Sequence, residues 1–141
     1  MQVHRLEEKL REKDLRLTES RKLVFEVLLK ASRALTPKEL HESLTDKTDL
    51  ASIYRNLTLF KDLGLVHSLS DGAYSVCQHD HEDHDHKHIH IITSCQKCGL
   101  TEEINEHESE LCEASKKLSG FSKHLNEVSS ILLQGLCKSC S

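Results

Sequence analysis

Apolar residues recur at helical spacing, every three or four positions, through the first part of the chain. Residues 3–17 carry a thin leucine stripe among many charges, and Thr18 can cap a second helix. Thr36 opens the sequence TPKE, which places a proline in the first turn and completes a capping box. Asp49 can cap a fourth helix that ends at Gly64. This pattern predicts four helices in succession.

After these helices the pattern changes to short strand-like runs. The segment LVHSLSDGAYSVC (65–77) places Asp71-Gly72, a strong tight-turn signal, between two such runs. The last three predicted helices followed by a β-hairpin have the element order of a winged helix-turn-helix.

The rest of the chain predicts a second, smaller unit. Residues 78–87 contain no apolar side chain and read as a solvated linker. The alternating sequence at 88–93 predicts a strand, 107–118 a helix and 129–137 a last strand. The fold class expected is α+β. The expected parts are a winged helix-turn-helix domain (1–77), a His/Asp-rich hinge (78–87) and a small α/β domain (88–141).

Charge and composition narrow the choice of partners. The net charge of −4 is unfavourable for binding to nucleic acid. However, residues 1–66 carry 13 Lys/Arg against 11 Asp/Glu, so this half can still meet phosphates. No apolar run approaches the roughly 20 residues of a membrane span, and the N-terminus is charged throughout. We therefore expect a cytoplasmic protein, in which thiols stay reduced and paired cysteines bind metal.

Two CxxC pairs form the strongest chemical signal in the chain. Cys95 and Cys98 form one pair, and Cys137 and Cys140 form the other. Two such pairs on separate turns suit a tetrahedral, structural zinc ion, one per chain, that contributes folding energy directly. The alternative is a redox dithiol, for which a lone CxxC beside a βαβ pattern is typical. Cys112 lies inside a predicted helix and reads as a core or surface thiol.

A closed four-cysteine site leaves Cys77 and the histidines unexplained. His67 opens the predicted hairpin and Cys77 closes it, so we expect them to be neighbours at its open end. His88 and His90 are two apart on a predicted strand and therefore point to one face. These residues, with a glutamate at 102–103, could form a second site that bridges the linker and acts as a switch. Most of the linker histidines are expected to be solvated.

Together these motifs resemble the Fur family of bacterial metal-dependent repressors. The resemblance covers about residues 15–140. It is carried by LTESRKLVFEVL, TPKELHESL, ASIYRNLTLFKDLGLV, the Gly72 hairpin, HxH, CQKCG and the terminal CKSC. It implies a winged-helix DNA-binding domain, a hinge and a dimerisation domain with structural zinc. Family members act as metal-loaded homodimers that bind AT-rich inverted repeats in double-stranded DNA and repress metal-uptake genes.

The resemblance also implies which residues meet DNA. Tyr54 and Arg55 match recognition-helix residues that contact bases and phosphates, and Arg21 matches a basic position near the start of the second helix. Ser52 and Asn56 of the same recognition helix complete the candidate DNA contacts. The alternative for Tyr54 is a core aromatic.

The regulatory metal is indicated by a departure from the family pattern. Iron- and peroxide-sensing members usually have a carboxylate where this chain has Cys77, and a cysteine there resembles the zinc-sensing branch, Zur. By this resemblance, His67, Cys77, His88 and Glu103 correspond to the hinge site of that branch, and His90 is the alternative to His88. This implies a second, regulatory Zn2+ per chain.

We therefore expect a zinc-responsive transcriptional repressor that binds DNA as a homodimer when metal occupies the hinge site. The main alternative is a regulator of the same family that senses iron, nickel or peroxide. A zinc enzyme is disfavoured because the chain lacks HExxH and the deaminase signature, so no small organic substrate is expected. A metal buffer built on the histidine run does not account for the helix around Tyr54.

Overall fold

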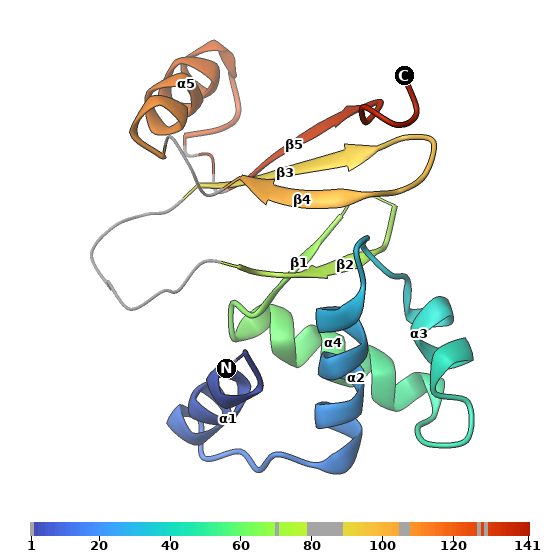
Figure 1. The fold of residues 1–141 in the computed structure, drawn as a ribbon. Helices are drawn as coiled ribbons and strands as arrows, with labels where there is room; N and C mark the ends of the chain where they lie inside the picture. Colours follow the sequence, from blue (N-terminus) through green and yellow to red (C-terminus); the bar gives the residue numbers. More distant parts are fainter. Residues whose placement is uncertain (1, 70, 79–88, 105–107, 127, 129) are drawn as a thin grey trace. The chain divides into compact units, whose positions relative to one another are not determined.

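The computed structural model describes residues 2–69, 71–78, 89–104, 108–126, 128 and 130–141. Helices and strands are mixed, as predicted for an α+β chain (Figure 1). Contacts between residues divide the chain into a first unit, Met1–Cys77, and a second unit, Gln78–Ser141. Among the described residues, no helix combines the length and the apolarity that crossing a bilayer requires.

The first unit contains four helices and a two-stranded hairpin in the predicted order. They are α1 (Gln2–Glu12), α2 (Glu19–Lys30), α3 (Pro37–Ser43), α4 (Leu50–Asp62), β1 (Val66–Ser68) and β2 (Tyr74–Val76). The strands β1 and β2 pair antiparallel, and an isolated bridge between Leu35 and Tyr74 ties the hairpin to the segment before α3. This element order is that of a winged helix-turn-helix.

The helix starts follow the predicted caps. The side chains of Thr18 and Asp49 each accept a hydrogen bond from a backbone N–H in the first turn of α2 and α4. Thr36 and Glu39 form the full capping box at α3. Gly64 follows α4 with φ of 69°, a conformation that glycine adopts without the strain a Cβ would cause. These predictions are confirmed.

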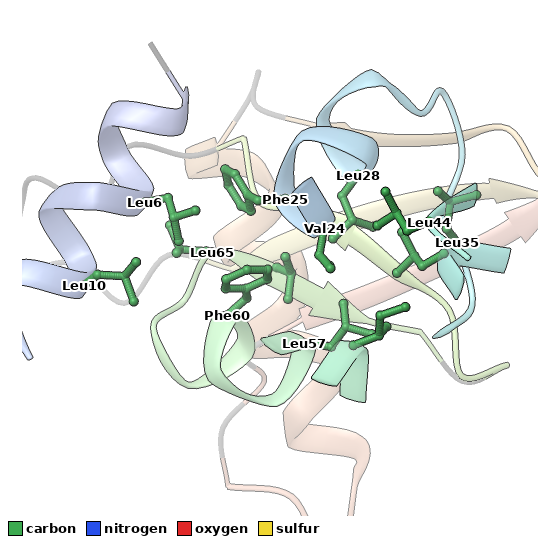
Figure 2. Packing of buried hydrophobic residues seen from close by; sticks show 13 residues of the cluster. Leu6, Leu10, Val24, Phe25, Leu28, Leu35, Leu44, Leu57, Phe60 and Leu65 are labelled. Atoms are coloured by element: carbon green, nitrogen blue, oxygen red, sulfur yellow. The ribbon is translucent and has the colours of Figure 1, made fainter. Parts of the chain in front are cut away.

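One apolar cluster holds the first unit together (Figure 2). Its buried members are Leu6, Leu10, Val24, Phe25, Leu28, Leu35, Leu40, Leu44, Ile53, Leu57, Phe60, Leu65 and Val66. The rings of Phe25 and Phe60 meet edge to face, with centroids 5.4 Å apart. Because Leu6 and Leu10 are fully buried, the thin stripe at the N-terminus packs α1 onto this core.

The second unit is a three-stranded sheet and one helix. Its elements are β3 (His90–Cys95), β4 (Thr101–Ile104), α5 (Glu108–Phe121) and β5 (Ser130–Gly135). The strand order is β4-β3-β5, in which β3 pairs antiparallel with β4 and parallel with β5. The parallel register places Cys95 opposite Gly135, so β3 and β5 end at the same edge of the sheet. Each strand therefore leads into its CxxC turn at that edge (Figure 1).

Two substitutions at the capping box of α3 should separate the contribution of the capping hydrogen bonds to stability from that of the ion pair. Glu39 bonds the Arg33 guanidinium at 2.8 Å, and this contact, with the Thr36 backbone N–H, lowers the pKa of Glu39 from 4.5 to about 2. Glu39→Gln keeps the cap but removes the charge, so we expect a loss of about 0.5 kcal/mol at pH 7, because both side chains reach solvent. Thr36→Ala removes the cap itself and costs about 1 kcal/mol.

The pH dependence follows from the sign of this shift. A carboxylate whose pKa is lowered in the folded state stabilises the protein above its unfolded pKa, and that contribution disappears as pH falls toward 2. Urea denaturation at several pH values should therefore show the Glu39→Gln difference shrinking between about pH 5 and pH 2. A difference that is constant over this range would contradict the ion pair.

Candidate metal centres and DNA-facing helix

Four cysteines of the second unit converge at the edge where β3 and β5 end. Cys95 is the last residue of β3, Cys98 lies in the turn that follows, and Cys137 and Cys140 follow β5. The four sulfur atoms all lie within 4.8 Å of one another. Residues about forty positions apart are thus brought together by the parallel pairing of β3 with β5.

The spacing of these sulfur atoms fits a tetrahedral zinc ion. Zn–S bonds of about 2.3 Å in a tetrahedron place the sulfur atoms about 3.8 Å apart. The Sγ atoms of Cys98 and Cys137 are separated by 3.8 Å. A closed set of four thiolates is typical of structural zinc, which holds no open position for a substrate.

The electrostatics of the cluster favour a cation at its centre. Backbone N–H groups of Cys98 and Cys137 point at the Cys95 sulfur, the latter from 3.4 Å, and lower the pKa of Cys95 to about 6. In contrast, the neighbouring Cys137 thiol and burial raise the pKa of Cys140 to about 12. Cys95 therefore ionises more readily than an ordinary thiol, whereas the ionisation of Cys140 is disfavoured unless a positive charge lies among the sulfur atoms.

In the first unit, His67 and Cys77 lie on the same face of the hairpin. His67 in β1 is opposite Ser75. Cys77 is two residues beyond Ser75, so its side chain points to the face of His67 as a diagonal neighbour, which is within reach of long side chains. Cys77 is fully buried, and its N–H donates to the Leu65 carbonyl at 2.8 Å. The two residues that the sequence singled out here are therefore neighbours at the open end of the hairpin.

In the second unit, His90 and Glu103 form a close pair. His90 Nδ1 lies 2.8 Å from Glu103 Oε1, and the Gln78 N–H donates to Glu103 Oε2 at 2.7 Å. Glu103 is only 8% exposed, so these contacts compensate for the burial of its charge. When Nδ1 carries the proton and donates to the carboxylate, the imidazole presents Nε2 to an ion.

The strand register decides between two of the candidate glutamates. Glu103 is opposite Ile92 and shares the face of His90, whereas Glu102 is opposite Thr93 and exposed. Glu103 is thus the residue that joins His90. His88, the other predicted histidine, lies outside the described residues, as do the histidines at 79–86.

Helix α4 presents three of its candidate DNA contacts to solvent. Tyr54 is 53% exposed, so it is not a core aromatic. Arg55 is also exposed, and its Nη2 donates to the hydroxyl of Ser52 at 3.2 Å. Ser52 in turn donates its backbone N–H to the capping carboxylate of Asp49. An aromatic ring, a guanidinium and a hydroxyl therefore lie together along the first turns of α4.

Asn56 lies on the opposite, buried side of α4. It is 8% exposed, and its Nδ2 donates to Ser20 Oγ at 3.0 Å. Ser20 Oγ is 2.8 Å from Thr48 Oγ1, so a chain of hydrogen bonds joins α4, the start of α2 and the turn before α4. We call these three residues the polar lock. Sequence reasoning missed Ser20 and Thr48, although Asn56 follows the buried Ile53 by three positions, which already places it on the core side.

Arg21, the remaining DNA candidate, is half-buried near the start of α2. Its Nη1 donates to the backbone carbonyl of Arg16. The guanidinium thus ties the start of α2 to the segment between α1 and α2.

Comparison with known proteins gives one consistent family. Residues 12–129 match the Ferric uptake regulator family. The peroxide-responsive repressor PerR of Staphylococcus epidermidis is 30% identical over 97% of this chain and 91% of its own length. The crystal structure of holo XcZur is 26% identical, with a TM-score of 0.68 over 97% of this chain and 94% of that one. A zinc uptake regulator complexed with zinc and DNA shares the fold, at 21% identity and a TM-score of 0.68, over 97% and 91% of the two chains.

Loss of one cysteine from the cluster should unfold the second unit. Structural zinc contributes about 10–16 kcal/mol of binding free energy, which the rest of this unit cannot replace. We expect Cys137→Ser to lower the zinc content by about one ion per chain and to make residues after 89 susceptible to limited proteolysis. Cys112→Ser, which changes a thiol of α5 outside the cluster, is the matched control and should retain the ion. Equal zinc content in both variants would exclude the cluster as the site.

The polar lock gives a prediction about stability. Asn56→Ala leaves Ser20 and Thr48 without their partner in a partly buried place, so we expect a loss of about 1–3 kcal/mol in the free energy of unfolding. Thr58→Ala, on the exposed side of the same helix, should stay within about 0.5 kcal/mol of wild type. Urea denaturation monitored by circular dichroism measures both, and equal values would show that the lock contributes nothing.

Proposed function

The chain belongs to the Ferric uptake regulator family of metal-responsive transcription regulators, and from this premise we propose that it is a zinc-responsive repressor. We define its hinge site as His67, Cys77, His90 and Glu103. In this proposal, Zn2+ at the hinge site raises affinity for double-stranded DNA, whereas the four-cysteine site holds a permanent, structural Zn2+. The first unit serves as the DNA-binding domain and the second as the dimerisation domain.

One observation carries the proposal of a hinge site. The backbone N–H of Gln78, the residue bonded directly to Cys77, donates to Glu103, and the same carboxylate holds His90. The residue that follows Cys77 in the chain is therefore hydrogen-bonded to the carboxylate that also holds His90. An ion bound by all four side chains would restrict the hinge, because two of its ligands belong to each unit.

The donor set favours zinc among the candidate metals. It offers one thiolate, two imidazoles and one carboxylate, and a soft sulfur ligand suits zinc better than iron(II) or manganese. Four side chains also match the tetrahedral coordination that zinc prefers. A peroxide- or iron-responsive regulator is the second candidate, supported by the 30% identical peroxide-responsive relative. The Cys77 thiol is the feature that weighs against it.

The exposed side of α4 supports DNA as the partner. In helix-turn-helix proteins the recognition helix enters the major groove, where Tyr54 can contact a thymine methyl and Arg55 a base edge or phosphate. Asn56 contributes through the polar lock, which fixes α4 against α2. Arg21 can meet a phosphate from the start of α2.

Exposed apolar side chains of the second unit support a homodimer. They include Leu118, Phe121, Leu125, Leu133 and Leu136. Phe121 is 86% exposed, which is costly for an aromatic ring unless another surface covers it. A second copy of the chain is the proposed cover. It would also supply the second recognition helix that an inverted-repeat operator requires.

The test compares DNA affinity with and without zinc at the hinge site. A DNA probe is first selected from a random pool by the zinc-loaded protein, and affinity is then measured by fluorescence anisotropy. Mild chelation should lower the affinity of the wild type by roughly 5–150-fold, the usual range of allosteric coupling. Cys77→Ser and His90→Gln should remove this zinc dependence while retaining one zinc ion per chain. Glu102→Gln, on the exposed face of β4, is the matched control.

The metals are compared on the same stripped protein. Zn2+ should restore DNA binding at lower free concentration than Fe2+, Mn2+ or Ni2+. Restoration by Fe2+ but not by Zn2+ would establish the second candidate instead. Full zinc dependence in Cys77→Ser would remove Cys77 from the site.

A further inference from the structure

Helix α1 reaches the proposed metal ligand Cys77 through Arg5. The Nη1 atom of Arg5 donates a hydrogen bond to the Cys77 carbonyl at 3.0 Å, across 72 positions of sequence. Both residues belong to the first unit. The contact thus joins α1 to the backbone of a proposed metal ligand.

The contact completes a set of restraints on the Cys77 backbone. Its N–H donates to the Leu65 carbonyl at 2.8 Å, which extends the pairing of β1 and β2 by one residue. Its C=O accepts from Arg5. When both peptide groups of a residue are held, the direction of its Cα–Cβ bond is fixed, and a cysteine sulfur then has only the three χ1 rotamers left. Arg5 thus supplies one of the two restraints that aim the thiol.

Packing alone does not account for an arginine at this position. Leu6 and Leu10 already bury α1 against the core, with exposures of 0% and 1%. Arg5 Nη2 is buried and has no hydrogen-bond partner among the described residues. A buried, unpaired donor of a charged group costs free energy, so a neutral side chain would dock the helix more cheaply. The specific gain from arginine is its bond to the ligand's carbonyl.

We propose that Arg5 is a positioning residue for Cys77, and that it makes α1 part of the metal switch. The inference rests on the hinge site proposed above. With Arg5 in place, the thiolate is aimed at the ion before the ion arrives, so less ordering is needed on binding. By linkage, an ion that holds Cys77 in this position also strengthens the docking of α1 through the same hydrogen bond.

The first experiment measures the zinc affinity of the hinge site by competition with a chelator, on full-length protein whose four-cysteine site stays loaded. Arg5→Gln should weaken this affinity roughly 10-fold, as the loss of a partner that orients a metal ligand does elsewhere. Arg5→Lys keeps a charged donor and should recover part of the loss. Lys9→Gln removes a cation from the next turn of α1, where it pairs with Glu12, and should bind zinc as wild type does.

A merely structural role for Arg5 would lower the melting temperature of the zinc-stripped protein and leave the zinc affinity unchanged. That result would overturn the proposal. Cys77→Ser distinguishes this failure from failure of the hinge site itself. If Cys77→Ser also binds zinc with wild-type affinity, the hinge site is wrong. If Arg5→Gln binds zinc with wild-type affinity and Cys77→Ser does not, the hinge site is supported and the positioning role of Arg5 is wrong.

A second measurement follows the coupling in the chain with Arg5 in place, so it does not depend on how the Arg5 variants fold. Amide hydrogen exchange in α1 should slow when zinc fills the hinge site, and Cys77→Ser should abolish the effect. Exchange in α3, which lies elsewhere in the first unit, serves as the internal reference. Equal exchange in α1 with and without zinc would show that the helix is not coupled to the metal.

Discussion

The second unit, as far as the structure describes it, has a small apolar core. Within its described part, the buried apolar residues are Ile91, Ile92 and Cys95, whereas the first unit has a continuous core reaching from α1 to the hairpin. Small folds with so little core depend on metal ions, disulfides or oligomerisation. The four-cysteine cluster can meet this need by binding a metal ion. The exposed leucines and phenylalanine of α5 and β5 can meet it by self-association. Metal binding and self-association would therefore each add stability that the core of this unit does not provide.

The difference in core size between the two units also limits where a regulatory ion can act. The first unit is stable through its own core, and its ligand-type residues, His67 and Cys77, lie at the edge where that unit ends. His90 and Glu103 lie on neighbouring strands of the sheet that the other metal site stabilises. An ion that takes ligands from both pairs of residues would therefore act only on the connection between the two units. The four-cysteine site is a poor candidate for the sensor, because loss of its ion would unfold the second unit.

The sequence predicts local features well and long-range contacts poorly. Helix caps such as Thr36 and Asp49 act within one turn, and their residue types alone located α3 and α4. The two CxxC pairs predicted a shared site because their chemistry requires four sulfur ligands, whichever fold unites them. The hydrogen bond from Asn56 to Ser20 joins two helices, and the Arg5–Cys77 contact spans most of the first unit. Neither leaves a periodic signal in the sequence.

The polar lock reduces the structural change that metal binding would have to cause. Because Asn56, Ser20 and Thr48 fix α4 inside the first unit, the recognition helix has its shape and position within that unit without an ion at the hinge. In the proposed switch, zinc would then need only to change how often the two units, and hence two α4 helices of a homodimer, adopt the spacing that DNA accepts. Such a population shift is limited by the difference in zinc affinity between the competent and incompetent arrangements. In this proposal, a metal that binds both arrangements equally well would occupy the site and leave DNA binding unchanged, so the geometry of the ligands, more than their affinity, would determine which metal the protein senses.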